Sequence, residues 1–269
     1  MKLRDKVAII TGAAGGMGRA TALLFAEEGA AIAAVDLSEE SLELTLKEIR
    51  AKGGRAIGIG ADITRTADVR RIVERTVAEF GNPTVLVNNA GVDTEAKRKL
   101  VDIPEEAFDR AVEVNLKAPW LMMKHVVPPM IAAGGGSIIN TASIAAFVAI
   151  ATVGYTAAKA GLVAMTRVAA VELGPHHIRV NALCPGATWT PMARKIRKEQ
   201  TELGQPVRRN IVEKKAVLGR MADPMEMAKA ALFLASDDSS FATGIAFAND
   251  GGWTANGGWD EIQGLFGSR

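Results

Sequence analysis

Short apolar runs alternate with longer amphipathic stretches along most of this chain. The runs are rich in Ile, Val and Ala without polar alternation, which indicates strands buried on both faces. They cover residues 6–10, 30–36, 55–62, 84–91, 136–143 and 177–186. Stretches typical of helices lie at 18–29, 38–54, 66–81, 118–134, 155–173 and 224–237. Ser38 is a candidate N-cap for the second of these helices.

Strands that alternate with helices in this way predict parallel crossovers and therefore an α/β fold. We predict a Rossmann-type doubly wound parallel sheet flanked by helices. The chain has 269 residues, of which 48% are hydrophobic and 23% are charged, and it can bury a sizeable core. It contains no linker, low-complexity segment or repeat of solenoid period. We therefore expect residues 1–269 to form a single domain.

Charge and cysteine content narrow the classes of protein further. A formal net charge of +2 creates no overall field that would favour nucleic acid or a membrane surface. The one cysteine, Cys184, cannot form an internal disulfide, which fits a reducing cytoplasm. The N-terminus lacks the apolar core of a signal peptide, and no apolar stretch is long enough to span a bilayer. His125, His176 and His177 show no ligand spacing with Cys184, so we expect no metal site.

A glycine-rich segment, TGAAGGMG at 11–18, separates the first predicted strand from the first predicted helix. Glycine permits a tight turn and a close approach to a pyrophosphate, which a helix N-terminus attracts. Asp36 ends the second predicted strand, where a carboxylate can accept hydrogen bonds from an adenosine ribose; the alternative is an ordinary acid at a helix N-terminus. This carboxylate would repel a 2′-phosphate, and the turn holds no basic residue before Arg19. We therefore expect NAD in preference to NADP.

The only tyrosine of the chain, Tyr155, stands four residues before Lys159 in a predicted helix. Residues four apart share one helix face. An ammonium within about 4–6 Å can lower the pKa of a phenol by about 1–3 units. A tyrosine with a lowered pKa can take a proton from an alcohol or return one to a ketone. The pair therefore predicts an acid/base group.

Four segments, taken in their order along the chain, resemble the motifs of the short-chain dehydrogenase/reductase family in its compact single-domain form. They are TGAAGGMG (11–18), NNAG (88–91), YTAAK (155–159), and PG (185–186) followed by Thr190. The resemblance extends over at least residues 5–252. It implies a nicotinamide-dependent oxidoreductase.

The resemblance also implies the catalytic residues. Tyr155 would be the acid/base group, and Lys159 would lower its pKa and hold the nicotinamide ribose. Ser143, together with Tyr155, would hydrogen-bond the substrate oxygen. Asn115 would anchor a water that links Lys159 to proton exchange with bulk solvent. Taken singly, Ser143 could instead cap a turn and Asn115 could be an inward polar group of a helix.

Further residues would bind the cofactor if the resemblance holds. Asp62 would bind the adenine amino group through its side chain, and Ile63 would do so through its backbone. Asn89 would line the adenosine half, while Thr188 and Thr190 would hold the nicotinamide carboxamide. The other cofactor-binding residues that the resemblance implies are Gly12, Gly16, Met17, Gly18, Gly91, Pro185 and Gly186.

The chain departs from the family pattern in one wall of the expected substrate pocket. Ser143 precedes Tyr155 by 12 positions, one fewer than is usual in the family, and the segment 144–154 lacks the customary proline. The resemblance also places a substrate lid at about 188–220. Eight basic residues and three glutamates in 193–215 favour a solvated helix face over recognition of an anionic substrate.

Two stretches favour self-association. The helices expected at 118–134 and 161–173 are apolar around much of their circumference. The resemblance implies that they pair across two-fold axes, which favours a homotetramer. The aromatic-rich tail at 253–269 is expected to pack on a neighbouring subunit or over the mouth of the active site.

These features together favour an NAD-dependent oxidoreductase that interconverts a secondary alcohol and its ketone. The phrase PGATWTPM at 185–192 is similar to that of family members acting on cyclic alcohols and ketones. The alternative within the family is a 3-oxoacyl-thioester reductase that uses NADPH. A non-catalytic nucleotide-sensing protein is the alternative of another class, and the set of Ser143, Tyr155 and Lys159 argues against it. Enoyl reductases are disfavoured because related ones use a wider spacing from tyrosine to lysine.

Overall fold

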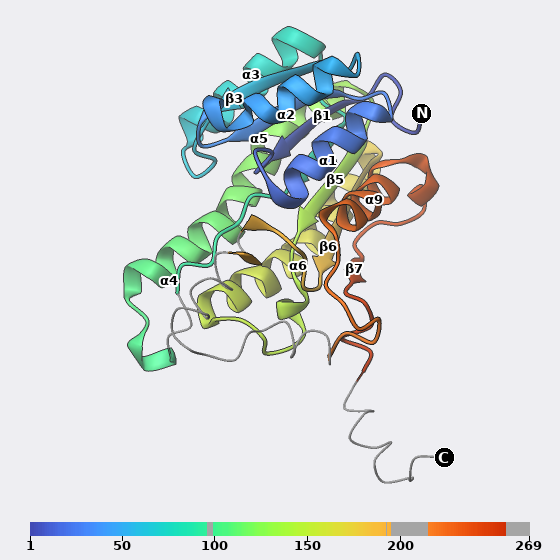
Figure 1. Ribbon diagram of the computed structural model, residues 1–269. Coiled ribbons are helices and arrows are strands. Elements are labelled where there is room, and N and C mark those ends of the chain that lie inside the picture. Colours follow the sequence, from blue (N-terminus) through green and yellow to red (C-terminus); the bar gives the residue numbers. More distant parts are fainter. Residues whose placement is uncertain (96–98, 192, 195–214, 257–269) are drawn as a thin grey trace, which may run out of the picture.

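A single parallel sheet forms the centre of the molecule (Figure 1). The computed structural model describes residues 1–95, 99–191, 193, 194 and 215–256. The strands in these ranges are β1 (Val7–Thr11), β2 (Ala31–Asp36), β3 (Ala56–Gly60), β4 (Val85–Asn88), β5 (Gly136–Thr141), β6 (Ile178–Pro185) and β7 (Ala246–Asn249). Their order across the sheet is β3-β2-β1-β4-β5-β6-β7. The predicted doubly wound parallel sheet is confirmed, and β7 is an addition for which the residue pattern had given no range.

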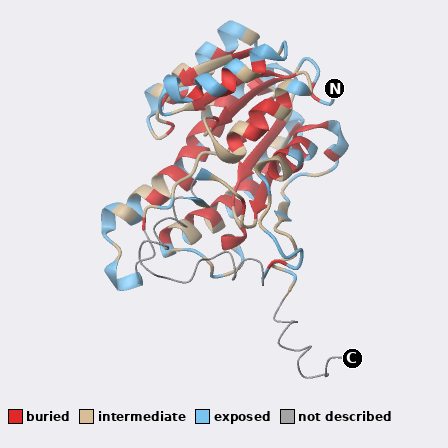
Figure 2. Cartoon of the chain, in the orientation of Figure 1, coloured by how far each residue is buried: buried red, intermediate tan, exposed pale blue. Residues whose placement is uncertain are grey.

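Helices cover both faces of the sheet, as the apolar strands require. Neighbouring residues of β1 point to opposite sides: Ile10 belongs to a core shared with α1, α2 and α9, while Ile9 belongs to a core shared with α3 and α5. The longer helices within the described residues are α1 (Gly16–Glu27), α2 (Glu39–Ala51), α3 (Thr66–Phe80), α4 (Glu105–Val112), α5 (Ala118–Ala132), α6 (Val153–Leu173) and α9 (Pro224–Ala235). Figure 2 shows the buried residues concentrated in the strands and on the helix faces that meet them. Strands of this kind need no polar alternation, because neither face meets water.

Two helix starts show how far the local sequence determines a cap. Ser38 is the N-cap residue of α2, as predicted, but its side chain accepts no hydrogen bond from the helix. Asp223 instead caps α9 through a complete capping box, in which its carboxylate accepts from Met225 N and Glu226 binds back to Asp223 N. The position of the Ser38 cap is confirmed, and the expected side-chain contact is absent.

The sheet reverses its strand order between β1 and β4. The chain adds β2 and β3 on one side of β1, and then returns to place β4 and the later strands on the other side. In open α/β sheets, ligands bind outside the carboxyl ends of the strands at such a switch point. None of the helices in the described part of the chain combines the length and apolar character that a bilayer crossing requires.

Candidate active site

Two cavities adjoin each other at the carboxyl end of the sheet. The first has a volume of about 330 Å³ and follows the ends of β1 to β4. The second has a volume of about 410 Å³ and lies between the segment after β5, the start of α6 and the segment after β6. The residues common to both linings are Met17, Ala142, Tyr155 and Thr190. Tyr155 therefore lies at the boundary between the two cavities.

Glycines shape the turn that lines the first cavity. Gly12 and Gly16 have φ angles of 70° and 55°, which favour glycine. A Cβ on Gly12 would lie 2.9 Å from the amide nitrogen of Asn89, which itself donates to Thr11 O. Gly18 lines neither of these two cavities. A Cβ on Gly18 would clash with Gly12 O, so the glycine lets α1 approach the turn closely, while its contact with a cofactor stays a prediction.

The start of α1 offers backbone donors to the same cavity. Its N-cap is Gly15, which has no side chain that could accept from the first N–H groups of the helix. An anion fits such a site because the helix dipole is positive there. The nearest basic residue in the sequence, Arg19, is held by Glu48, with 2.5 Å between Arg19 Nη2 and Glu48 Oε2.

Asp36 lies on the wall of the first cavity, as the sequence predicted. Its Oδ2 accepts a hydrogen bond of 3.0 Å from Ala14 N, and its Oδ1 accepts one of 2.9 Å from Leu37 N. These two bonds fix the carboxylate against the glycine turn. Each oxygen keeps further lone-pair capacity for a ligand hydroxyl.

Asp62 and Ile63 line the far end of this cavity together with Arg110, which the sequence analysis missed. Asp62 Oδ1 accepts from Thr64 N (3.0 Å) and Thr64 Oγ1 (2.7 Å), and Arg110 Nη2 lies 3.9 Å from Asp62 Oδ2. Burial opposes the charge, but the Thr64 bonds and the Arg110 guanidinium hold the pKa of Asp62 below its usual value. An arginine in an amphipathic helix resembles a solvated surface residue, so no sequence signal marked Arg110.

Tyr155 and Lys159 share one face of α6, which confirms the spacing argument. The Lys159 side chain is buried, and its Nζ donates a 2.7 Å hydrogen bond to Thr141 O. The same nitrogen lies over the Tyr155 ring, 5.6 Å from the ring centroid. The lysine is thus held by the end of β5 and packs against the phenol.

The pKa of Tyr155 is raised rather than lowered, so the expectation from the sequence is wrong. Burial raises the pKa of Tyr155 to about 12, although a hydrogen bond with Ser143 lowers it, and the charge of Asp93 raises it further. Burial also lowers the pKa of Lys159 to about 8. The lysine therefore loses its charge at a lower pH than the one at which the phenol ionises. The two groups lie together, but loss of water outweighs their mutual attraction.

Ser143 caps a turn, as one interpretation of the sequence proposed, and its hydrogen bond to the substrate oxygen stays a prediction. Its Oγ accepts a 3.1 Å hydrogen bond from Ala145 N and so caps the short helix η3 (Ile144–Ala146). It also lines the second cavity and hydrogen-bonds Tyr155. The backbone of Ser143 contacts the thiol of Cys184, whose pKa burial raises to about 11. Cys184 is fully buried and packs in the core as a small residue.

Asn115 lies in a π-helical turn, η2 (Glu113–Lys117), between α4 and α5. Its Nδ2 donates to Val92 O and Ala111 O, both at 2.8 Å, and its Oδ1 accepts from Val92 N at 3.1 Å. A Cβ on Gly91 would lie 2.8 Å from Asn115 Oδ1 and 3.5 Å from Lys159 Nζ. Asn115 thus supports the loop that carries Gly91 beside the lysine, while its role as a water anchor stays a prediction.

The second cavity has mostly apolar walls. The segment in which the chain departs from the family pattern forms one wall, with Ile144, Ala145, Ile150 and Ala151. The segment after β6 forms another, with Pro185, Gly186, Ala187, Thr188, Thr190 and Ala193. Asp93 and Trp253 complete the lining and had no role in the sequence analysis of the site. Trp253 opens the tail that was expected over the active-site mouth, and 257–269 lie outside the described residues.

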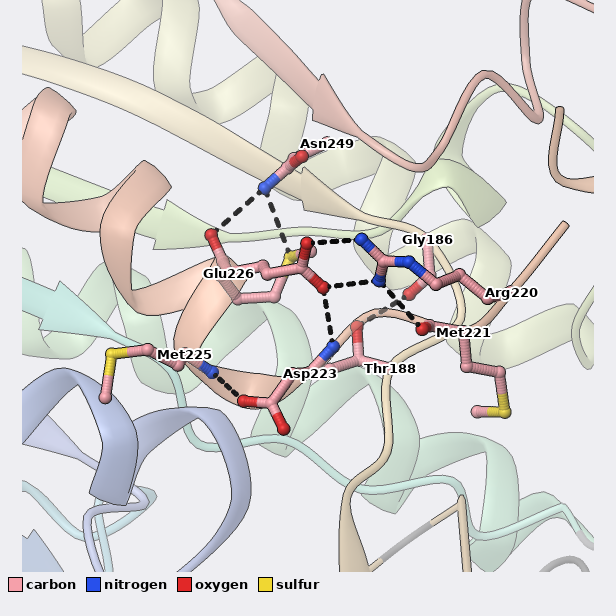
Figure 3. Close-up of polar contacts among 9 residues, drawn as sticks. Gly186, Thr188, Arg220, Met221, Asp223, Met225, Glu226 and Asn249 are labelled. Carbon is pink, nitrogen blue, oxygen red and sulfur yellow. Dashed lines mark hydrogen bonds and ion pairs between the residues drawn. The ribbon is translucent and has the colours of Figure 1, made fainter. Parts of the chain in front are cut away.

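The described ends of the predicted lid meet beside this cavity. Thr188 Oγ1 donates to Gly186 O at 3.1 Å, and Trp189 N donates to Ala222 O at 3.0 Å. Figure 3 shows how Arg220 then forms a paired contact with Glu226 at the start of α9, with both N–O distances 2.7 Å. Residue 192 and residues 195–214 of the lid lie outside the described residues. The base of this segment is therefore fastened to α9.

Comparisons with known proteins agree with this geometry. A family model described as enoyl-(acyl carrier protein) reductase matches residues 12–254. The 3-oxoacyl-(acyl-carrier-protein) reductase of Thermotoga maritima is 40% identical over 253 residues, which are 94% of this chain and 99% of that protein. Cyclohexanol dehydrogenase of an Acinetobacter species is 36% identical over 255 residues, 94% and 97% of the two chains. The crystal structure of levodione reductase superposes with a TM-score of 0.89 at 33% identity, covering 94% of this chain and 99% of that one.

Proposed function

The chain belongs to the short-chain dehydrogenase/reductase family, and on that premise we propose that it is an NAD-dependent oxidoreductase interconverting a secondary, preferably cyclic, alcohol and its ketone. The position of Tyr155 carries this proposal. Its phenol lies where the two cavities meet, with Lys159 on the wall of the first and Ser143 on the wall of the second. One proton-transfer group can therefore serve a cofactor on one side and a substrate on the other.

The first cavity fits a dinucleotide. Across the sheet it extends from Asp62 after β3 and Asp36 of β2, past the uncapped start of α1 after β1, to Lys159 beside β5. Backbone N–H groups of the α1 turn would hold the pyrophosphate, Asp36 the adenosine ribose and Lys159 the nicotinamide ribose. When bound, the dinucleotide would accept or supply the hydride and, in its oxidised form, bring the positive charge of its ring into the site.

Tyr155 and Ser143, which line the second cavity, would transfer the proton to or from the substrate oxygen. A phenol whose pKa is about 12 keeps its proton at neutral pH and is ready to donate it to a ketone oxygen. The Ser143 hydroxyl hydrogen-bonds the phenol and can position the substrate oxygen against it. In the oxidation direction the same phenol must first lose its proton, and positive charge in the site favours that loss.

The choice of NAD rests on Asp36 and Arg19. Asp36 is fixed against the glycine turn by Ala14 N and Leu37 N, where its carboxylate repels a 2′-phosphate. Arg19, which could attract such a phosphate, is engaged by Glu48. The local charge near the ribose end therefore favours the cofactor without the extra phosphate.

A cyclic substrate is supported by the second cavity and by two of the compared proteins. Apolar side chains such as Ile144, Ile150 and Trp253 offer contact to a hydrocarbon ring. Cyclohexanol dehydrogenase and levodione reductase bear names that describe cyclic compounds. A 3-oxoacyl-thioester reductase remains the alternative within the family, supported by the similarity to the Thermotoga maritima enzyme.

A substrate panel tests the proposal and separates it from its alternatives. Purified protein is incubated with cyclic and acyclic secondary alcohols plus NAD or NADP, and absorbance of the reduced cofactor is followed. We expect the largest kcat/KM with a cyclic alcohol and NAD. Preference for NADPH and a 3-oxoacyl thioester would establish the reductase alternative. Nucleotide binding without turnover on any alcohol or ketone would instead favour the sensing protein.

We further propose that the protein is a homotetramer in the cytoplasm. The side chains of Val168 and Val171 on α6 are 58% and 78% exposed, and Trp120 on α5 is 45% exposed, so both helices present apolar surface to solvent. Burial of such surface against a second copy stabilises an oligomer. Light scattering of purified protein tests the assembly, and a monomer mass at micromolar concentration would refute it.

A further inference from the structure

The lining of the second cavity contains one charged side chain among the described residues, that of Asp93. The other lining residues are apolar or carry a hydroxyl, as Ser143, Thr188 and Thr190 do. Small-molecule sites are typically apolar, with a few placed polar groups that fix the orientation of the ligand. Asp93 is an exposed residue of this wall, and its carboxylate can accept a hydrogen bond from a ligand in the cavity.

The backbone on both sides of Asp93 is fixed. Val92 exchanges two hydrogen bonds with the Asn115 side chain, of 3.1 and 2.8 Å. Thr94 Oγ1 donates to Ala107 O at 2.6 Å, and the fully buried Glu95 accepts a 2.7 Å hydrogen bond from Gly154 N. A functional side chain on an anchored backbone can be placed with the precision that recognition requires.

The anchor at Gly154 depends on the absence of a side chain there. A Cβ on Gly154 would lie 2.2 Å from Glu95 Oε1, so only glycine lets this carboxylate reach the backbone N–H. Residues 92–95 are thereby docked on the first turn of α6, one residue before Tyr155. The position of Asp93 is thus coupled to the helix that carries the acid/base group.

The carboxylate of Asp93 is oriented but not saturated. Thr152 Oγ1 donates a 3.2 Å hydrogen bond to Asp93 Oδ1. A carboxylate can accept about four hydrogen bonds, and within the described ranges Thr152 is its only hydrogen-bond donor, which leaves capacity for a ligand. The charge of Asp93 also acts on the Tyr155 phenol, whose pKa it raises, so the two groups face a common space.

We propose that Asp93 selects the substrate of the second cavity by accepting a hydrogen bond from a second hydroxyl, while Ser143 and Tyr155 engage the reacting one. The preferred substrates are then cyclic diols or hydroxyketones. Cyclic alcohols that carry a carboxylate are disfavoured, because Asp93 repels them. This inference rests on the proposed alcohol–ketone activity and adds the substrate class to it.

The test compares substrates that differ only in a second group. Cyclohexanol, the 1,2-, 1,3- and 1,4-cyclohexanediols and 4-hydroxycyclohexanecarboxylate are oxidised with NAD by the wild type, Asp93→Ala and Asp93→Asn. Asp109→Asn is the control, since Asp109 is an exposed acid of α4 that lines neither of the two cavities. The readout is the ratio of kcat/KM for diol to that for cyclohexanol. Any change in the Tyr155 pKa affects both substrates and cancels in the ratio.

We expect the wild type and Asp109→Asn to prefer at least one diol over cyclohexanol. Asp93→Ala should lower that ratio by about ten-fold, the size expected for a hydrogen bond to a charged acceptor, and Asp93→Asn should relieve the rejection of the carboxylate. A ratio unchanged by Asp93→Ala, or a wild type that prefers the carboxylate, would overturn the role of Asp93 while leaving the alcohol–ketone activity standing. Turnover of none of these compounds would overturn both.

Discussion

The two cavities that meet at Tyr155 are built by different means. The first is lined by the turns that follow β1 to β4, where strand ends, glycines and a helix N-terminus fix the backbone. The second is lined by side chains from segments far apart in the sequence, among them Asp93, Ile150 and Trp253. The first cavity can thus be common to a family, since it depends on backbone geometry. The second cavity can differ among relatives without disturbing the sheet.

Apart from Tyr155 itself, the largest effect is expected at Lys159, which lines the first cavity. Lys159→Met should lower kcat by about 10²-fold or more, because it removes the donor that supports the acid/base group. The Lys159→Met variant should remain folded and lose no stability. Burial lowers the folded-state pKa of Lys159 from 10.5 to about 8, so its charge destabilises the folded protein below pH 8. The melting temperature of the variant at neutral pH should equal or exceed that of the wild type.

Lys229→Met serves as the matched control for this change. Lys229 is exposed on α9 and lines neither of the two cavities, so its replacement should leave turnover unchanged. Melting curves and steady-state kinetics of both variants distinguish a catalytic role of Lys159 from a structural one. A large fall in the melting temperature of Lys159→Met alone would show that the lysine serves the fold rather than the reaction.

The next effect concerns the ribose end of the first cavity. Asp36→Asn keeps the shape of the side chain but removes the charge, so it should relieve the repulsion of a 2′-phosphate. The variant should also weaken the hydrogen bonds from the adenosine ribose, because its acceptor is no longer charged. We therefore expect the ratio of kcat/KM for NAD to that for NADP to fall about ten-fold. Asp102→Asn, at an exposed position outside both linings, should leave the ratio unchanged. A wild type that already prefers NADP would contradict the assignment of Asp36.

The smallest effect distinguishes the sequence-based view of the Tyr155–Lys159 pair from the structural one. Tyr155 is the only tyrosine, so near-ultraviolet absorbance of tyrosinate reports it alone. We expect ionisation near pH 12 in the folded protein, against 10.0 for an ordinary tyrosine. Lys159→Met should barely move this titration, because burial brings the pKa of Lys159 to about 8 and the lysine is already neutral when Tyr155 ionises.

Ionisation of Tyr155 also changes the free energy of unfolding, and the direction of the pKa shift sets the sign of that change. The folded-state pKa of Tyr155 is raised, so the folded protein holds the proton more tightly than the unfolded chain. This stabilising contribution is complete below pH 10.0 and is lost as the pH rises to about 12. Circular dichroism in parallel verifies that the protein is still folded. Ionisation below pH 10 that moves upward in Lys159→Met would restore the sequence-based view.

Much of the fold and of the first cavity could be predicted from the sequence. Parallel strands that are buried on both faces appear in the sequence as short continuous apolar runs. Glycine is favoured where φ is positive, as at Gly12 and Gly16. Asp36 follows a strand directly, so the strand itself places it. Each of these signals is local, and local signals can be read from one sequence.

The second cavity and the electrostatics could not be predicted in the same way. Asp93 is held in the cavity lining by contacts between distant residues, such as that of Glu95 with Gly154 across 59 positions. The sign of the Tyr155 pKa shift depends on burial by the whole fold, which the spacing of two residues does not reveal. Long-range packing decides both.

In the proposed reaction, Tyr155 exchanges the substrate proton at the junction of two adjoining cavities. Tyr155→Phe tests it most directly, because the change removes one oxygen and leaves the packing of the ring in place. NAD binding is measured by calorimetry and turnover by absorbance of the reduced cofactor with a cyclic alcohol that the wild type oxidises. We expect nearly unchanged NAD affinity and a fall in kcat of about 10²–10⁴-fold. Retention of more than about a tenth of the wild-type kcat would contradict it, because acid–base catalysis contributes more than that.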